Sequence, residues 1–383
     1  MHERVIRAAL LVTTTTAALG PSLVQAQGDG LVPTDFYHEV GVGEVAISPD
    51  GALVAFTVTT IDEDQNQRHR EVWLQELRGG RPSDDPFRFT DPTREASAPR
   101  WSPDGRILSF ESRRGGDSDA HSTWFARVTF PGGEAYQING VDAAPVWSPD
   151  GNWIAYVARP TTATDPEVTN RDGWIAPDAI SATLSAERFD GRVITTMSYK
   201  RDGTARLLPH PASVPKRQLF VVSADGGDAT QRTDLPFDVD DPIWSAEGER
   251  LYFTGDELED DDHNREATTD IYVVGREAGD AEKLTVNPGN DTAPALSPDG
   301  AILAYLHNRG RGEPTDVRVV GLAADGSFRG IPRNLTGDWD LIPSAPSWTA
   351  SGNAVRFVAG VGGNRHVFEV DATGELIRQV TTG

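Results

Sequence analysis

The sequence contains no cysteine, and basic residues are scarce. Without a thiol the chain has no disulfide, no cysteine nucleophile, and no cysteine-ligated zinc or iron-sulfur cluster, so packing has to supply its stability. The 35 Lys and Arg stand against 58 Asp and Glu, which gives a formal net charge of −23. Such a chain repels phosphate backbones and anionic lipid surfaces. The composition therefore argues against nucleic acid and polybasic membrane binding.

Long hydrophobic runs are also missing, and the first 26 residues read as a targeting segment. Arg4 and Arg7 precede a short apolar stretch, and Val24-Gln25-Ala26 offers small residues at the −3 and −1 positions of a cleavage site. The alternative is an N-terminal membrane anchor, but the apolar run falls well short of the ~20 residues needed to span a bilayer. We expect a signal peptide over 1–26, cleavage after Ala26, no membrane span, and a periplasmic or secreted protein.

Glycine and proline are abundant, with 38 and 26 residues, and many of them belong to an internal repeat. The tetrapeptide Ser-Pro-Asp-Gly occurs four times, and two looser copies read SAEG and TASG. The six copies begin at Ser48, Ser102, Ser148, Ser245, Ser297 and Thr349. Proline, aspartate and glycine in this order favour a tight turn. A turn that recurs about every fifty residues indicates a repeat architecture.

Residues flanking the turn repeat as well. Four copies carry Trp immediately before the turn: Trp101, Trp147, Trp244 and Trp348. All six carry an aromatic residue eight positions after its first residue: Phe56, Phe110, Tyr156, Phe253, Tyr305 and Phe357. An aliphatic residue stands two positions before each aromatic, which is the spacing of one buried face of a β-strand. We predict that Phe110 and Tyr156 are buried at equivalent positions of adjacent units. The repeated tryptophans suggest packing between units rather than a carbohydrate-binding cluster.

A second strand pattern follows each turn, as in EVWLQEL from Glu71 and DIYVV from Asp270, and short segments such as EKLT suggest edge strands. Each unit of about fifty residues then holds four strands, which is the size of a propeller blade. The predicted fold is an all-β propeller of six recognisable four-stranded blades over residues 31–383. The ring is six-bladed, or seven-bladed with one blade missing.

One interval between turns is much longer than the others, with 97 residues from Ser148 to Ser245. It contains a single tail strand, near Gln218, and no second Trp-Ser head. We therefore favour an insertion at about 161–216 over a degenerate seventh blade. Long insertions are where propellers often carry function, although a solvated loop fits the sequence equally well.

Candidate metal sites are weak. The eight histidines are scattered without a paired metal spacing such as His-Glu-x-x-His. The acidic run from Asp256 to Asp262 lacks the spaced pattern of a calcium loop and reads as a solvated loop. We predict no metal, no cofactor, and no catalytic residue in the chain.

Three segments are similar in sequence to a known protein family: SAPRWSPDGRILSFESRRGG from Ser97, FPGGEAYQI from Phe130, and APVWSPDGNWIAYVARP from Ala144. They resemble the N-terminal propeller of prolyl-oligopeptidase-family serine peptidases, in the acylaminoacyl-peptidase and dipeptidyl-peptidase branch. RVITTMSYKRDG from Arg192 is similar to the extended hairpin of that branch. The resemblance covers residues 31–383, and the propeller of the periplasmic protein TolB uses similar turns.

The resemblance implies a Gly-x-Ser-x-Gly nucleophile elbow in a separate α/β-hydrolase domain. This sequence has no such elbow, and its nearest approach, from Gly116 to Ala120, lacks the final glycine. We therefore expect a non-catalytic, substrate-gating module of an exported peptidase, present as a fragment or the product of a split gene. Its partners would be peptide substrates and a hydrolase domain or subunit. The alternative is a stand-alone propeller of the TolB kind that binds other periplasmic proteins. A propeller enzyme using its own axial channel is a third hypothesis, for which the sequence offers no acid-base constellation.

Overall fold

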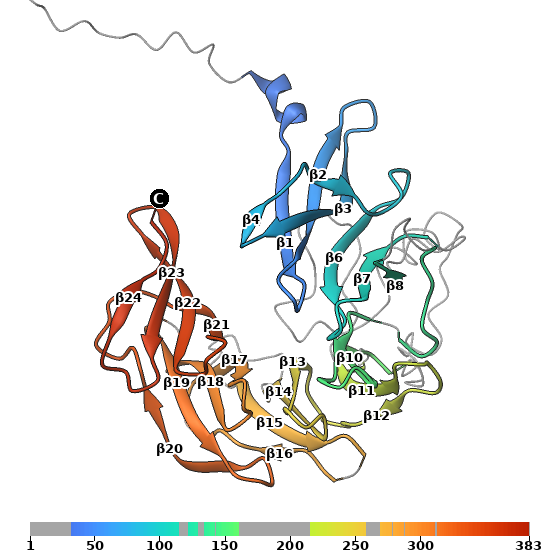
Figure 1. Cartoon of the computed structure of the whole chain (residues 1–383). Helices are drawn as coiled ribbons and strands as arrows, with labels where there is room; N and C mark the ends of the chain where they lie inside the picture. Colours follow the sequence, from blue (N-terminus) through green and yellow to red (C-terminus); the bar gives the residue numbers. More distant parts are fainter. Residues whose placement is uncertain are drawn as a thin grey trace, which may run out of the picture.

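The chain folds into a ring of β-sheet blades in the computed structural model (Figure 1). The structure describes residues 32–114, 122–128, 134–141, 143–160, 215–257, 269–277, 279–286, 288–310 and 312–382. The predicted signal segment and residues 161–214 of the predicted insertion lie outside these ranges, as does most of the acidic run. No helix in the described ranges is long and apolar enough to cross a membrane.

Each blade is built from strands that are consecutive in the sequence. A short 3-10 helix, η1 (Pro33–His38), precedes them. Blade 1 contains β1 (Gly41–Ile47), β2 (Leu53–Asp62), β3 (Gln67–Arg78), β4 (Arg81–Pro82) and β5 (Phe87–Arg88). Blade 2 contains β6 (Ala96–Trp101), β7 (Ile107–Ser112) and β8 (Ser122–Arg127), with the bridge from Phe125 to Tyr136 in the fourth position. Blade 3 contains β9 (Val146–Trp147), β10 (Trp153–Ala158), β11 (Gln218–Ser223) and β12 (Thr230–Gln231).

The remaining three blades repeat the same antiparallel order. Blade 4 contains β13 (Val239–Trp244), β14 (Arg250–Asp256), β15 (Thr269–Gly275) and β16 (Glu282–Lys283). Blade 5 contains β17 (Asn290–Leu296), β18 (Ile302–Asn308), β19 (Thr315–Leu322) and β20 (Phe328–Asn334). Blade 6 contains β21 (Ser344–Trp348), β22 (Ala354–Val361), β23 (Asn364–Asp371) and β24 (Ile377–Gln379). The predicted all-β propeller is confirmed, and of its two forms the chain adopts the six-bladed one.

The repeated turn forms as its residue types require. Ser48 Oγ lies 2.6 Å from Asp50 Oδ1, which also accepts the backbone N–H of Ala52 at 3.0 Å. The N–H of Leu53 donates to Ser48 Oγ at 2.9 Å, and Gly51 takes a left-handed φ of 70°. The other Ser-Pro-Asp-Gly copies make the same serine-to-aspartate hydrogen bond. Each turn joins the first two strands of its blade.

The core is divided into five buried clusters, and each lies between two consecutive blades. Between blades 1 and 2, for example, Val72 and Leu74 of β3 pack with Leu108 and Phe110 of β7. The repeated aromatics of blades 2 to 6 are at most 2% exposed, which confirms the burial predicted for Phe110 and Tyr156. None of the five clusters includes described residues of both blade 6 and blade 1.

Tryptophan side chains fasten alternate blade pairs together. The indole N–H of Trp101 donates to the carbonyl of Ala46 in blade 1 at 3.0 Å. Trp244 does the same to Val146 at 2.8 Å, and Trp348 to Ala295 at 3.0 Å. Each indole therefore bonds the backbone of the preceding blade, which confirms that these residues pack between units.

Candidate functional site

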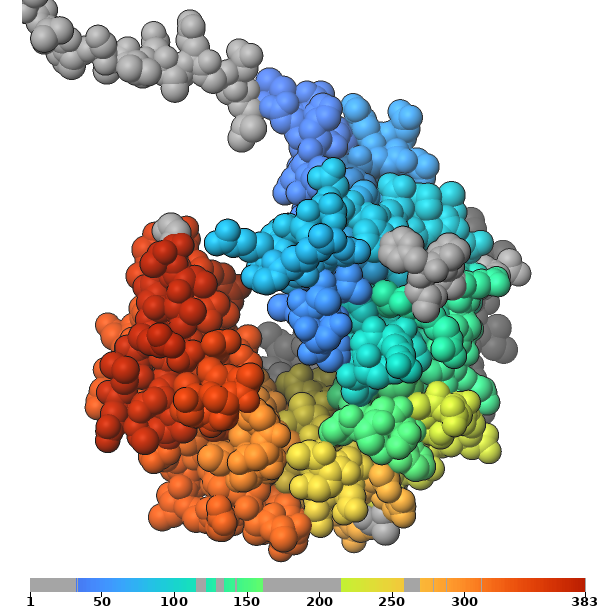
Figure 2. Space-filling model, viewed as in Figure 1, coloured from blue at the N-terminus to red at the C-terminus, as the bar shows by residue number. Residues whose placement is uncertain are grey.

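The ring is open between blade 1 and blade 6, and the opening leads to the centre of the molecule (Figure 2). Blade 1 carries the repeated aromatic Phe56, but no blade covers it, and its side chain is only half-buried. Ile47 of β1 stands where four other blades have Trp, so blade 1 has no indole to bond the carbonyl of blade 6. The seam thus lacks the buried aromatic found at the other five blade contacts, and it also lacks the indole hydrogen bond that joins blades 1 and 2, 3 and 4, and 5 and 6.

The side of the seam formed by blade 1 combines an apolar surface on β1 and β2 with an ion pair on its outer strands. Val42 of β1 pairs with Val58, Ile47 pairs with Val54, and Phe56 pairs with Trp73 of β3. Cross-strand partners share one face of a sheet, so these residues form one apolar surface. The same face also carries Glu71, which pairs with Val58, and Arg88, which pairs with Trp73 and lies 2.7 Å from Glu71. Val42 and Ile47 are 66% and 62% exposed.

The side formed by blade 6 is charged. In the other five blades the residue before the repeated aromatic faces the next blade and is at most 2% exposed: Ala55, Ser109, Ala155, Tyr252 and Ala304. Blade 6 has Arg356 at this position. Arg356 Nε lies 3.1 Å from Glu369 Oε2, and Arg378 Nη2 lies 2.7 Å from Glu369 Oε1. The two arginines hold the pKa of the Glu369 carboxyl below its usual value, so the face keeps its charges.

The strands nearest the centre of the ring share a backbone distortion. A β-bulge interrupts β1, β6, β13, β17 and β21, and one non-glycine residue of each bulge has a left-handed φ near 50°. These residues are Glu44, Ala98, Asp241, Ala293 and Ala345. Such a conformation costs a non-glycine residue about 1–2 kcal/mol, so its recurrence shows that the bulge is built into the repeat.

Acidic side chains stand at two of these bulges. Glu44 Oε2 accepts the N–H of Ala98 at 2.8 Å and the hydroxyl of Thr57 at 2.6 Å, linking blade 1 to blade 2. Burial raises the pKa of Glu44, but these two hydrogen bonds outweigh burial and lower it overall. Partial removal of the Asp241 carboxylate from water and the nearby charge of Asp240 raise the pKa of Asp241, although the charge of Arg217 opposes them.

The directions of the strands place the start of β1, the end of β24 and both ends of the long link between β10 and β11 on one side of the ring. Strands alternate in direction within each blade, so the start of β1, the end of β24, and every link between second and third strands lie at the same end of the ring. We call this end the terminal rim. The link between β10 and β11, which contains the predicted insertion, belongs to it. The Ser-Pro-Asp-Gly turns lie at the opposite end.

One aspartate holds the two ends of that link together. Arg159, just after β10, places Nη1 3.4 Å from Asp238 Oδ1. Arg217, just before β11, donates its backbone N–H to the same oxygen at 2.6 Å and places its Nε 3.6 Å from Asp238 Oδ2. Arg217 Nη1 also lies 3.0 Å from Asp240 Oδ1. The excursion therefore leaves and rejoins blade 3 at one point on the terminal rim.

The described residues do not assemble a catalytic constellation. His307 Nδ1 lies 2.8 Å from Asp291 Oδ1, but both side chains are sealed inside blade 5, at 2% and 0% exposure. This pair suits a structural role. The described ranges contain no group of three or more His, Asp or Glu placed to hold a metal ion. The prediction that the chain has no catalytic or metal site also concerns the residues outside these ranges, and it stays a prediction.

Sequence reasoning missed one feature, a cavity between blades 1 and 2 that contains Arg94 and Arg114. The two arginines are twenty residues apart, on different blades, and no motif connects them. The local sign of this cavity in the sequence is the adjacent basic pair Arg113-Arg114, directly after β7, in an acidic chain.

Comparisons with known proteins agree with the fold. No family model matches the chain. Dipeptidyl-peptidase 5 of Porphyromonas gingivalis is 24% identical over 383 residues, covering 96% of this chain and 52% of that protein. The chain thus spans about half the length of the curated relatives it matches.

Two solved structures share the architecture. Acylaminoacyl peptidase of Pyrococcus horikoshii matches with a TM-score of 0.58 and 16% identity, over 91% of this chain and 47% of that one. The propeller domain of the Trilobed protease of Pyrococcus furiosus, described as having an open velcro topology, matches with a TM-score of 0.56 and 13% identity, over 91% and 85%. These identities establish the fold alone. Together with the sequence match they confirm the resemblance read from the motifs: the chain is a six-bladed β-propeller similar to those of prolyl-oligopeptidase-family peptidases.

Proposed function

We propose that the chain is the non-catalytic propeller of an exported prolyl-oligopeptidase-family serine peptidase, and that it controls which peptides reach a hydrolase domain. The observation that carries the proposal is the terminal rim, where both ends of the described chain and both ends of the link containing the excursion are gathered. A hydrolase domain joined after residue 383 would face this rim. Its active site would then be reached through the ring.

The open seam supports a gating role for the propeller. The seam opens the ring to its centre (Figure 2), and an extended peptide chain is much narrower than a folded protein. The apolar side formed by Val42, Phe56 and Ile47 offers side-chain contacts to an unfolded segment, and the charged side formed by Arg356 and Glu369 stays hydrated. The seam therefore has the chemistry of an entrance for short peptides.

The absence of cysteine permits a direct test in the complete protein. In Val42→Cys the only thiol within residues 1–383 lies on the seam, and in Ile331→Cys it lies on β20 of blade 5, where Ile331 is 93% exposed. Any cysteine of a following domain is first replaced by serine. We expect a bulky maleimide polymer on Cys at position 42 to lower kcat/KM for eight-residue peptides more than for a dipeptide reporter. The same label at position 331 should change neither.

Two results would count against the proposal. One is an open reading frame that continues past residue 383 without a hydrolase elbow, together with no labelling of the complete protein by a serine-directed fluorophosphonate. The other is equal hydrolysis of long and short peptides after labelling at position 42. In the first case the stand-alone propeller becomes the better interpretation, and recovery of a specific protein from a periplasmic extract would support it.

Export is part of the proposal. The sequence pattern of residues 1–26 supports a signal peptide cleaved after Ala26 and a periplasmic or secreted location. N-terminal sequencing of the mature protein tests this directly, because an intact Met1 would contradict cleavage.

A further inference from the structure

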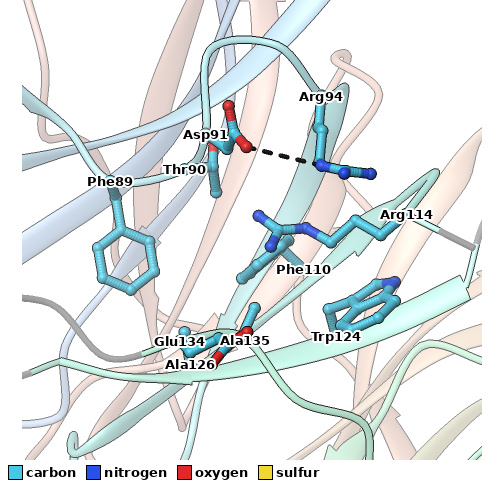
Figure 3. Close-up of a pocket in the computed structure, with 10 residues that line it drawn as sticks. All are labelled: Phe89, Thr90, Asp91, Arg94, Phe110, Arg114, Trp124, Ala126, Glu134 and Ala135. Atoms are coloured by element: carbon cyan, nitrogen blue, oxygen red, sulfur yellow. Dashed lines mark ion pairs between the residues drawn. The ribbon is translucent and has the colours of Figure 1, made fainter.

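A cavity of about 450 Å³ lies between blade 1 and blade 2, outside the open seam (Figure 3). Asp91 and Arg94 border it from the link between β5 and β6, and Arg114 borders it from the end of β7. These three residues belong to the terminal rim. Phe110 of β7 and Trp124 of β8 supply aromatic walls. The volume is in the range of small-molecule sites, and charged side chains line the cavity together with the aromatic rings.

Arg114 is held in place by aromatic rings rather than by a carboxylate. Its guanidinium carbon lies 5.3 Å from the centre of the Phe110 ring and 5.6 Å from that of Trp124. Its one hydrogen bond within the described ranges is a long one, from Nε to Ser112 Oγ at 3.4 Å. No described carboxylate lies within 4.0 Å of it. Burial lowers the pKa of Arg114, and the charge of Arg94 lowers it further while Asp91 opposes them. The guanidinium is thus oriented and partly desolvated, and its charge is unpaired.

The nearby acidic groups do not neutralise Arg114. Asp91 Oδ2 lies 3.6 Å from Arg94 Nε, and Asp91 Oδ1 accepts the N–H of Thr93 at 2.9 Å and its hydroxyl at 2.8 Å. These contacts hold the pKa of Asp91 below its usual value and direct its carboxylate toward Arg94. Glu134 is exposed and lies across the cavity from the arginines (Figure 3). A ligand carboxylate would be repelled by Glu134 and attracted to the Arg114 side.

We infer that this cavity binds the carboxylate of a short peptide, with Arg114 as the principal contact and Arg94 as a second. A planar guanidinium binds a planar carboxylate through two parallel hydrogen bonds, and the arrangement is strongest where water is partly excluded. An apolar side chain next to that carboxylate would lie against Phe110 and Trp124. The choice of a peptide rests on the proposed function, and the site would anchor one end of a peptide on the terminal rim.

A carboxylate of this kind comes from a C-terminus or from an acidic side chain, and three probes separate the sources. They are Gly-Ala-Leu with a free C-terminus, Gly-Ala-Leu amide, and acetyl-Glu-Leu amide, each added to the full chain and followed by saturation-transfer difference NMR. We expect the free acid to bind about tenfold more tightly than the plain amide, because the amide loses a charge-assisted pair of hydrogen bonds. Binding of acetyl-Glu-Leu amide at the level of the free acid would assign the site to acidic side chains as well.

Variants locate the binding. Arg114→Gln should abolish the difference between acid and amide. Arg94→Gln, which leaves the aromatic stack intact, should reduce the difference in part. Arg106→Gln is the matched control, because Arg106 lies at the opposite rim with its side chain 82% exposed. Thermal melts of these three variants show whether each one is folded. A fourth variant, Arg114→Lys, keeps the positive charge but lacks the planar guanidinium, and it should bind the free acid little better than Arg114→Gln does.

Several outcomes would overturn the inference. They are equal binding of acid and amide, unchanged binding in both Arg114→Gln and Arg94→Gln, or displacement of the peptide acid by inorganic phosphate at equal concentration, which would indicate a general anion site. Binding is measured without hydrolysis. A failure to find peptidase activity would therefore remove the proposed function without affecting the binding result. A failure to bind the peptide acid would likewise remove this inference without affecting the proposed function.

Discussion

Phe110 and Phe56 occupy the same position of the repeat but have different surroundings. Phe110 is 2% exposed and packs with Val72 and Leu74 of the preceding blade, while Phe56 faces the open seam and is half-buried. The free energy that an aromatic residue contributes depends on how much of its apolar surface is removed from water, so the same residue type stabilises these two blades unequally.

Phe110→Ala should lower the free energy of unfolding by about 3–5 kcal/mol, because a large buried ring is replaced by a cavity. Phe36→Ala is the control, since Phe36 is 50% exposed. Urea denaturation of both variants gives the two values. A loss below about 1 kcal/mol for Phe110→Ala, smaller than the usual cost of removing a core side chain, would show that the packing of β7 on blade 1 is wrong.

Asp241 provides a prediction on pH. Its pKa is raised in the folded protein, so the folded state holds this proton more tightly than the unfolded state does. Ionisation therefore reduces stability as pH rises from the unfolded value of 3.8 through the folded pKa. Asp241→Asn should raise Tm at neutral pH, and the gain should shrink below about pH 3, where both side chains are neutral. Asparagine also tolerates a left-handed φ, so a gain that does not change with pH would reflect the backbone alone.

At the scale of elements, the four-residue turn predicts most of the fold. Its proline, aspartate and glycine determine the link between two strands, and the aromatic eight residues later marks the buried face of the second. The open seam was not predictable in this way. Phe56 keeps the aromatic of the repeat as Phe110 does, and although Ile47 replaces the repeated Trp before its turn, that single change does not show that a covering blade is missing. The cavity at Arg114 was missed for a related reason, since its residues are brought together by the packing of two blades and not by a local pattern.

The turn aspartates give the second prediction on pH. A hydrogen bond from Ser102 and another from the N–H of Arg106 hold the pKa of Asp104 below its unfolded value. The stability that this aspartate contributes is present above an unfolded pKa of 3.8 and is lost as pH falls through the folded pKa. Asp104→Asn should therefore destabilise the protein at neutral pH, with a difference that vanishes toward about pH 2. Urea midpoints over this range measure it, and a constant difference would contradict the role of the charge.

At the scale of the whole molecule, the ring has two unlike ends. The exposed inner strands of blade 1 are mainly apolar, with Val42 and Ile47 on the seam, whereas blade 6 ends in the cluster of Arg356, Glu369 and Arg378. Contact between blade 6 of one molecule and blade 1 of another would bury these charges against apolar side chains, which is unfavourable. Head-to-tail contacts that do not close a ring build filaments, so the charged face opposes this form of assembly.

Removing the charges should change the state of the molecule. The triple variant Arg356→Val, Glu369→Val, Arg378→Val removes the charges of the blade 6 face, and we expect it to form concentration-dependent oligomers or to compact by closing the seam. Light scattering coupled to size-exclusion chromatography distinguishes oligomers from monomers, and small-angle X-ray scattering detects a compacted monomer. A variant that keeps the mass and radius of gyration of the original chain would refute the role of this cluster.

The contiguity of the blades bears on how the chain acquires its structure. Among the described strands, each blade is completed by strands that are close in the sequence, because β1 pairs with β2 and β24 pairs with β23. Most strand pairing is therefore local, and local pairing favours rapid folding. A chain synthesised from its N-terminus can complete blade 1 before blade 6 has been made, and each new blade packs against a blade that is already folded.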